Sequence, residues 1–183
     1  MTGSPVWIKI LQTIVAIILL CSLATTAVAN AEIELSQANG ETLTLPEPAR
    51  RIITLAPNLA ELIFAAGAGE QLKAVVEYSN FPAEVAKLPR VGDAFRIDLE
   101  RIIQLDPDLV IAWNSGNPQT ALQKLQQLGI TVWQLEITRP EQIADAVESM
   151  SRAAGTESTG VARARQLREQ LAGLQQRNAK KAP

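Results

Sequence analysis

Aromatic and polar side chains gather in the segments that follow four short apolar runs, at 56–58, 77–81, 113–117 and 136–138. If the runs are parallel strands, their carboxyl ends meet at the edge of the sheet where open α/β sheets bind ligands. Flat rings on rigid strand ends provide apolar contact and stacking, which suits a large planar or macrocyclic ligand. For any single ring the alternative is that it covers the nearby core. The candidate ligand-binding residues are Asn58, Tyr78, Phe81 and Trp113 in these segments, together with Phe95, which lies in another irregular stretch.

The sequence contains no histidine, and its one cysteine, Cys21, lies in the amino-terminal apolar segment. This composition excludes Ser-His-Asp and Cys-His catalysis, histidine general bases and the common zinc sites. An exported carboxylate-based hydrolase is the alternative from another functional class. The carboxylates nearest the expected crevice are those of Asp93, Asp98 and Glu136, but no paired-acid motif supports this alternative. We therefore predict no catalytic residue, no metal site and no cofactor.

The first 29 residues have the layout of a secretory signal peptide. A single charge at Lys9 precedes an apolar run, and small residues provide cleavage motifs after Ala29 or Ala31. A retained anchor is one alternative, but a membrane span needs about 20 apolar residues and this run is shorter. Lipid attachment at Cys21 is less favoured, because a bulky leucine precedes it. We expect residues 1–29 to be removed on export.

Removal of residues 1–29 takes away one of the 17 basic side chains, Lys9, and leaves all 19 acidic ones, a net charge of −3. Domains that bind nucleic acid carry a basic surface, so nucleic acid is excluded as a partner. The remaining chain is long enough for one ordinary domain and short for two.

Short β-branched runs alternate with helix-like segments along the rest of the chain. A hairpin is expected first, from segments 32–37 and 41–45 around Asn39-Gly40. Four further strands are expected at 51–55, 72–76, 109–112 and 131–135. Four helices are expected at 59–66, 98–105, 118–128 and 140–154, and the first of them has Asn58 as its start and Gly67 as its stop. The alternation predicts an α/β fold with a mostly parallel sheet flanked by helices.

A long polar helix is expected from about residue 158 to 180. Its apolar residues form a narrow stripe, marked by Val161, Ala164, Leu167, Leu171 and Leu174. A one-sided stripe must pack against another element. We expect a monomer, and an interaction module that dimerises through this helix is a third alternative.

Four motifs occur in order along the chain: RIITLAPNLAELIFAAG at 51–67, EYSNFPAEV at 77–85, DLERIIQLDPDLVIAW at 98–113 and LQQLGITVW at 125–133. Together they resemble the periplasmic binding proteins for vitamin B12 and ferric siderophores, over about residues 32–180. Members of that family have two α/β lobes joined by one long helix. They hold their ligand between the lobes and deliver it to an ABC permease in the inner membrane.

The resemblance implies a periplasmic substrate-binding component of an ABC importer that captures vitamin B12 (cobalamin) or a related corrinoid. Residues 30–157 are then the amino-terminal, Rossmann-like ligand-binding lobe, and residues 158–183 are the linking helix with a truncated end, the second lobe being absent. A ferric siderophore or haem is the alternative ligand within the family. Tyr78 could ligate haem iron, whereas siderophore anions would need arginines such as Arg90 or Arg96.

The resemblance also assigns roles to individual residues. Tyr78 matches a family position that stacks against cobalamin, and Trp113 matches another aromatic residue at the cleft wall. A tryptophan expected near position 94 is Ala94 here, with Phe95 beside it. Glu100 matches a surface glutamate that pairs with permease arginines. Glu100 would equally favour the dipole of the helix that it begins.

Overall fold

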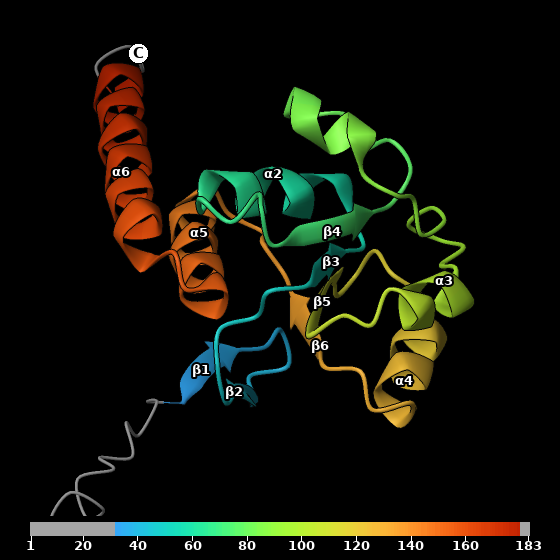
Figure 1. Cartoon of the computed structure of the whole chain (residues 1–183). Coiled ribbons are helices and arrows are strands. Elements are labelled where there is room, and N and C mark those ends of the chain that lie inside the picture. The colour runs from blue at the N-terminus through green and yellow to red at the C-terminus, as the bar shows by residue number, and fades with distance from the viewer. Residues whose placement is uncertain (1–31, 180–183) are drawn as a thin grey trace, which may run out of the picture. The chain divides into compact units, whose positions relative to one another are not determined.

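The computed structural model describes residues 32–179 (Figure 1). The predicted signal peptide, with both cleavage sites and Cys21, lies outside these residues. Between residues 32 and 179, no helix combines the length and the apolar character needed to cross a membrane.

The expected hairpin is confirmed. Strands β1 (Ile33–Ser36) and β2 (Thr42–Leu45) pair antiparallel. Gly40 has φ 84° in the connecting turn, and the side chain of Asn39 accepts a hydrogen bond from the backbone N–H of Glu41 at 3.0 Å. The hairpin is tied to the main sheet because the indole Nε1 of the buried Trp133 donates to the backbone oxygen of Ser36 at 3.0 Å.

A four-stranded parallel sheet forms the centre of the described structure. Its strands are β3 (Ile52–Thr54), β4 (Leu72–Val75), β5 (Leu109–Trp113) and β6 (Val132–Leu135). They lie in the order β4-β3-β5-β6, and every neighbouring pair is parallel. The chain leaves β3 for β4 on one side and then crosses to β5 on the other. The topological switch point, where open α/β sheets bind ligands, therefore lies between the carboxyl ends of β3 and β5.

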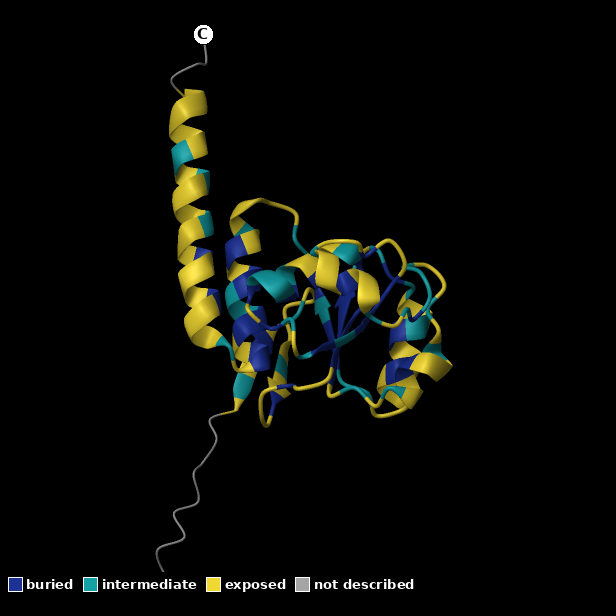
Figure 2. Ribbon diagram, turned by 45° about the horizontal axis from the view of Figure 1, so that its top comes forward, coloured by how far each residue is buried: buried dark blue, intermediate teal, exposed yellow. Residues whose placement is uncertain are grey.

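Helices cover both faces of the sheet. On one face α2 (Pro57–Ala65) and α5 (Glu141–Ala154) pack against Ile52, Ile111 and Trp133. On the other, α3 (Leu99–Gln104) and α4 (Gln119–Gln127) pack against Ile53, Val110 and Val132. Successive residues of a strand point to opposite faces, so each strand contributes to both cores. Figure 2 shows these strands as buried, which explains why they read as continuous apolar runs.

Local signals at the helix ends were partly correct. Gly67 ends α2 with φ 78° and donates its N–H to the carbonyl of Phe64 at 2.9 Å. Asn58 as the start of this helix was wrong: the N-cap lies two residues earlier, at Ala56, and has no side-chain cap. Pro57 explains the difference, since its fixed φ suits the first helical position. A short 3₁₀ helix, η1 (Ala83–Lys87), was not anticipated.

The long helix α6 (Glu157–Ala179) packs along α5. Gly160 and Ala164 are buried at this contact, and Leu167 is partly buried. The expected stripe was wrong at Val161, which is 39% exposed because the neighbouring Gly160 makes the close approach instead. Leu174, farther along the helix, is 49% exposed.

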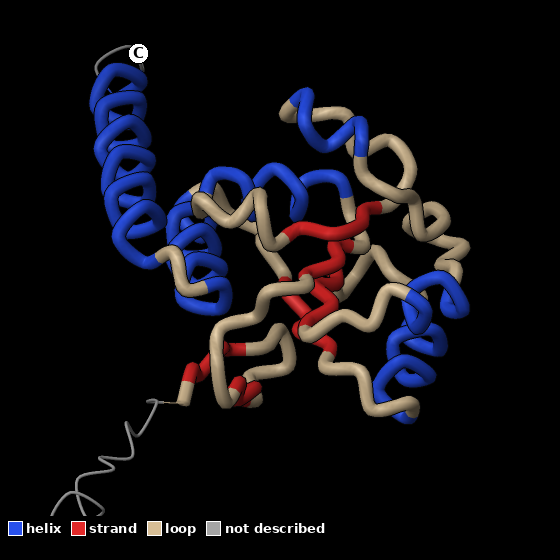
Figure 3. The backbone as a smooth tube through the Cα atoms, in the orientation of Figure 1, coloured by secondary structure: helices blue, strands red, loops and turns tan. Residues whose placement is uncertain are grey.

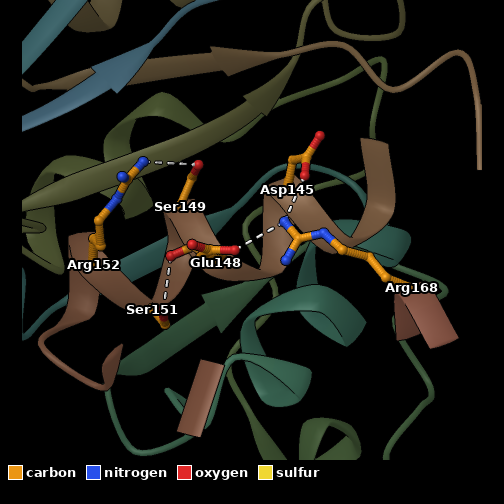
Figure 4. A network of polar contacts seen from close by, with 6 residues as sticks. All are labelled: Asp145, Glu148, Ser149, Ser151, Arg152 and Arg168. Atoms are coloured by element: carbon orange, nitrogen blue, oxygen red, sulfur yellow. Dashed lines mark hydrogen bonds and ion pairs between the residues drawn. The ribbon is translucent and has the colours of Figure 1, made fainter. Parts of the chain in front are cut away.

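An arginine joins the two helices on their exposed side (Figure 4). Arg168 of α6 donates to Asp145 at 2.7 Å and to Glu148 at 2.9 Å, both on α5. Hydrogen bonds from the guanidinium to Asp145 and then to Glu148 raise the pKa of Arg168. All three groups are at least a third exposed, so we expect each pair to contribute less than about 1 kcal/mol to stability.

Candidate functional site

A shallow cavity of about 290 Å³ lies at the switch point. It is lined by residues from the β3–α2 connection and the first turn of α2, from the end of β5 and the loop after it, and from the segment that precedes α3: Ala56, Asn58, Ala94, Phe95, Trp113, Gly116 and Asn117. Asn58 lies in the first turn of α2 and Trp113 ends β5, whereas the other lining residues belong to segments drawn as loops and turns (Figure 3). Three of the predicted ligand-binding residues, Asn58, Phe95 and Trp113, are therefore brought to one cavity from positions up to 55 residues apart.

Asn117 holds the walls of this cavity together. Its Nδ2 donates to the carbonyl of Leu55 at 2.9 Å and to that of Ala94 at 3.0 Å, and its Oδ1 accepts from the backbone N–H of Trp113 at 2.7 Å. The side chain thus links the ends of β3 and β5 to the segment that carries Phe95, and it is buried. No role for Asn117 was predicted from the sequence. The available signal was the Asn117-Pro118 pair, which marks a turn.

Trp113 ends β5 and is half-buried. Its indole Nε1 donates to Ser115 Oγ at 3.0 Å. The hydroxyl of Ser115 in turn hydrogen-bonds to Glu136 Oε1 at 3.0 Å, and its backbone N–H donates to Glu136 Oε2 at 2.9 Å. Gly116 has no side chain to meet the ring: a Cβ there would lie 2.9 Å from Trp113 Cδ1.

Phe95 is presented by a tight turn. Asp93 Oδ1 accepts from the backbone N–H of Phe95 at 2.8 Å and from that of Arg96 at 2.7 Å. These two backbone hydrogen bonds lower the pKa of Asp93, because they stabilise its charged form. Gly92 precedes the turn with φ 87°, and the Phe95 ring is 78% exposed at the rim of the cavity. Ala94 also lines the cavity, and its carbonyl accepts from Asn117.

Tyr78 and Phe81 follow β4, the neighbouring strand, and do not line the cavity. Both rings are exposed, that of Tyr78 by 80%. Tyr78 has φ 66°, a left-handed conformation that costs a non-glycine residue about 1 to 2 kcal/mol. Strained residues of this kind cluster at ligand sites, because the surrounding structure holds them there. The role of Tyr78 and Phe81 in ligand binding stays a prediction.

The arginines considered for anionic ligands have different environments. Arg90 is partly buried, and its guanidinium donates to the carbonyls of Val76 and Ser79 at 3.3 and 3.0 Å. It therefore supports the loop that carries Tyr78. Arg96 is exposed.

The carboxylates considered for catalysis are hydrogen-bonded to nearby groups. Asp93 holds the Phe95 turn, and Asp98 caps α3 by accepting from the N–H of Arg101 at 3.0 Å. Glu136 accepts from Ser115. Over residues 32–179, no three His, Cys, Asp or Glu side chains are grouped as ligands for a metal ion. Glu100 is exposed in the first turn of α3, where a carboxylate stabilises the helix dipole, and its contact with a partner stays a prediction.

The chain matches known proteins in sequence and in structure. A sequence profile described as "Periplasmic binding protein" matches residues 52–183. A Vibrio cholerae protein named vitamin B12-binding protein is 40% identical over 141 residues, which cover 77% of this chain and 51% of that protein. The solved structure of the periplasmic vitamin B12 binding protein BtuF of Vibrio cholerae superposes with a TM-score of 0.72 at 40% identity, covering 75% of this chain and 54% of that one.

A haem-binding protein shares the fold at lower identity. The apo structure of the periplasmic heme-binding protein RhuT from Roseiflexus sp. RS-1 has a TM-score of 0.61 at 25% identity, over 68% of this chain and 48% of that one. This chain spans about half the length of the relatives that it matches. The profile covers most of the chain and includes every candidate site residue. The expected parallel sheet flanked by helices is confirmed, and the chain belongs to the periplasmic binding protein family.

Proposed function

We propose that this chain is the substrate-binding component of an ABC importer, and that it captures vitamin B12 or a related corrinoid in the periplasm. The observation that carries the proposal is the aromatic cavity at the switch point, lined by Trp113 and Phe95. A corrinoid is a large, rigid macrocycle, and aromatic rings bind such a surface with little loss of conformational entropy. The 40% identity to a protein named vitamin B12-binding protein supports the same ligand.

The size of the cavity suggests how such a ligand is held. At about 290 Å³ it is at the lower end of the roughly 300 to 1,000 Å³ of ligand pockets. We propose that it receives one part of the macrocycle, and that Tyr78 and Phe81 extend the aromatic surface along the same edge of the sheet. Residues 30–157 then form the ligand-binding lobe, α6 serves as a linking helix, and Glu100 contacts a membrane permease.

Haem is the second candidate ligand. The phenol of Tyr78 is exposed, and tyrosine is a known axial ligand of haem iron. The haem-binding structure at 25% identity supports this candidate. A siderophore has less support, because the guanidinium of Arg90 is already hydrogen-bonded to backbone carbonyls.

The test is a parallel titration of the full chain with cyanocobalamin and with haemin, followed by calorimetry and by the absorption spectrum of the ligand. We expect cyanocobalamin to bind, and Trp113→Ala to weaken its binding. The matched control is Leu128→Ala, which truncates an exposed apolar side chain at the end of α4. Absence of heat and of a spectral change with cyanocobalamin contradicts the proposal. A shifted haemin spectrum that Tyr78→Phe abolishes would favour haem instead.

A further inference from the structure

A chain of hydrogen bonds runs from the wall of the cavity to the next strand. It begins at Trp113 Nε1, passes through Ser115 Oγ and ends at Glu136 Oε1, with 3.0 Å for each step. The indole N–H can only donate and the ionised carboxylate can only accept. The serine hydroxyl must therefore accept from the indole and donate to the carboxylate. The direction of these hydrogen bonds therefore follows from the chemistry of the three groups.

The tertiary structure brings these three residues together. Trp113 is the last residue of β5 and pairs in register with Leu135, the last residue of β6. Glu136 directly follows β6, and the N–H of Asn114 donates to the carbonyl of Leu135 at 2.9 Å. Because the two strands end together, the carboxylate reaches Ser115 across the sheet edge. Its second oxygen accepts from the backbone N–H of Ser115 at 2.9 Å, so the serine is held at two points.

The indole needs such a restraint. The χ2 torsion of tryptophan is broad, so a half-buried ring at a strand end samples several orientations unless a contact selects one. Here the edge of the ring that carries Nε1 and Cδ1 is bounded by the Ser115 hydroxyl and by Gly116, where a Cβ would lie 2.9 Å from Cδ1. The backbone N–H of Trp113 is held separately by Asn117. The ring also packs against the core, and its Nε1 edge is held by Ser115 and, through it, by Glu136.

We propose that Glu136 is a positioning residue that, through Ser115, fixes the ring of Trp113 in the wall of the cavity. A ring that is oriented in advance loses less conformational freedom when the ligand binds. The benefit of this restraint for ligand affinity rests on the proposed function. The restraint itself exists without ligand. It is therefore testable on its own.

The direct test is hydrogen exchange of the indole N–H groups in the ¹⁵N-labelled full chain, with Trp113→Phe to assign the signal. The side chains introduced by Ser115→Thr and Ser115→Val have nearly the same shape, but only threonine keeps the hydroxyl. We expect Ser115→Val and Glu136→Ala to speed exchange at Trp113 by about fivefold, the effect of one lost hydrogen bond. Ser115→Thr should exchange at the wild-type rate, and Glu136→Gln, which keeps one acceptor oxygen, should fall between.

Trp133 is the internal control, since its buried indole donates to Ser36 and not to this chain of hydrogen bonds. A variant that merely loosens the fold speeds exchange at both indoles, and the ratio of the two rates removes that effect. Ser158→Ala, at an exposed serine of α6, is the matched surface control. Equal Trp113-to-Trp133 ratios in the wild type and in Glu136→Ala would overturn the proposal.

Cyanocobalamin affinity then separates this proposal from the proposed function. We expect Ser115→Val and Glu136→Ala to raise the dissociation constant about fivefold, in parallel with indole exchange. An unchanged dissociation constant in variants with faster exchange overturns the positioning role. No binding by the wild-type chain contradicts the proposed function, while the exchange ratios still decide whether Glu136 restrains the ring.

Discussion

Replacement of Asn117 by aspartate should destabilise the fold strongly at neutral pH and much less in acid. Asn117 is 5% exposed, and its Nδ2 donates to two carbonyl oxygens, those of Leu55 and Ala94. Aspartate has nearly the same shape but presents a carboxylate oxygen at the position of Nδ2. Two donated hydrogen bonds then become repulsive contacts between oxygens. The bond from the N–H of Trp113 to Oδ1 is kept.

The magnitude follows from these contacts. Each lost hydrogen bond contributes about 1 kcal/mol, and an unsatisfied buried polar group costs about 1 to 3 kcal/mol. We expect Asn117→Asp to lower the free energy of unfolding by about 3 kcal/mol at pH 7, and Asn117→Ala by about 2 kcal/mol. Near 150 residues, 3 kcal/mol corresponds to a fall in Tm of about 10 °C. The facing carbonyls should raise the pKa of the introduced carboxyl, because only its protonated form can donate a hydrogen bond, through its single O–H, to one of them.

The assay is thermal unfolding from pH 7 to pH 4, with Asn80→Asp as the control at an exposed asparagine. A carboxyl whose pKa is higher in the folded than in the unfolded state destabilises at high pH, and this penalty shrinks as pH falls through the folded-state pKa. We therefore expect the Tm of Asn117→Asp to approach that of the wild type in acid. A fall in Tm at pH 7 no larger than that of Asn80→Asp would refute the role of Asn117 as the link between the cavity walls.

Trp113→Ala should raise the dissociation constant for cyanocobalamin about tenfold, the effect of about 1.4 kcal/mol, and should also lower the Tm, because the ring packs against the core. Calorimetry measures the affinity, and an unchanged affinity would exclude stacking on this ring. Gly160→Ala should destabilise the chain by about 1 to 3 kcal/mol, because the added Cβ would lie 2.1 Å from the Cβ of Ser151. Urea unfolding measures this loss of stability, and Gly173→Ala, at an open site, is the control. Asp93→Asn should destabilise at pH 7 but not in strong acid. A carboxyl whose pKa is lowered in the folded state stabilises the fold at pH values above its unfolded-state pKa, and this stabilisation is lost as pH falls through the folded-state pKa. Urea unfolding of the wild type and of Asp93→Asn tests this. Midpoints that differ equally at pH 7 and pH 2 would contradict the role of Asp93 in the turn.

Local sequence patterns were enough to locate most elements. Asn39-Gly40 lies in the turn of the hairpin, and Gly67 and Gly155 end helices with φ 78° and 70°. These signals work because a left-handed residue is required at one position, and glycine adopts that conformation at no steric cost. The same kind of reasoning was wrong at Asn58, where Pro57 already begins the helix. It was also wrong at Val161, because the close contact with α5 is made at Gly160.

The sequence by itself determined the parallel α/β fold and the strand end at which Trp113 is found, because periodicity and turn residues act over a few neighbouring positions. Only the tertiary structure decided that β3 and β5 are adjacent and that Asn117 joins their ends. The link from Glu136 to the Trp113 indole was decided in the same way, by the common register of β5 and β6. The contacts from Asn117 to Leu55 and from Ser115 to Glu136 join residues 62 and 21 positions apart, and no local pattern records which strands will pair.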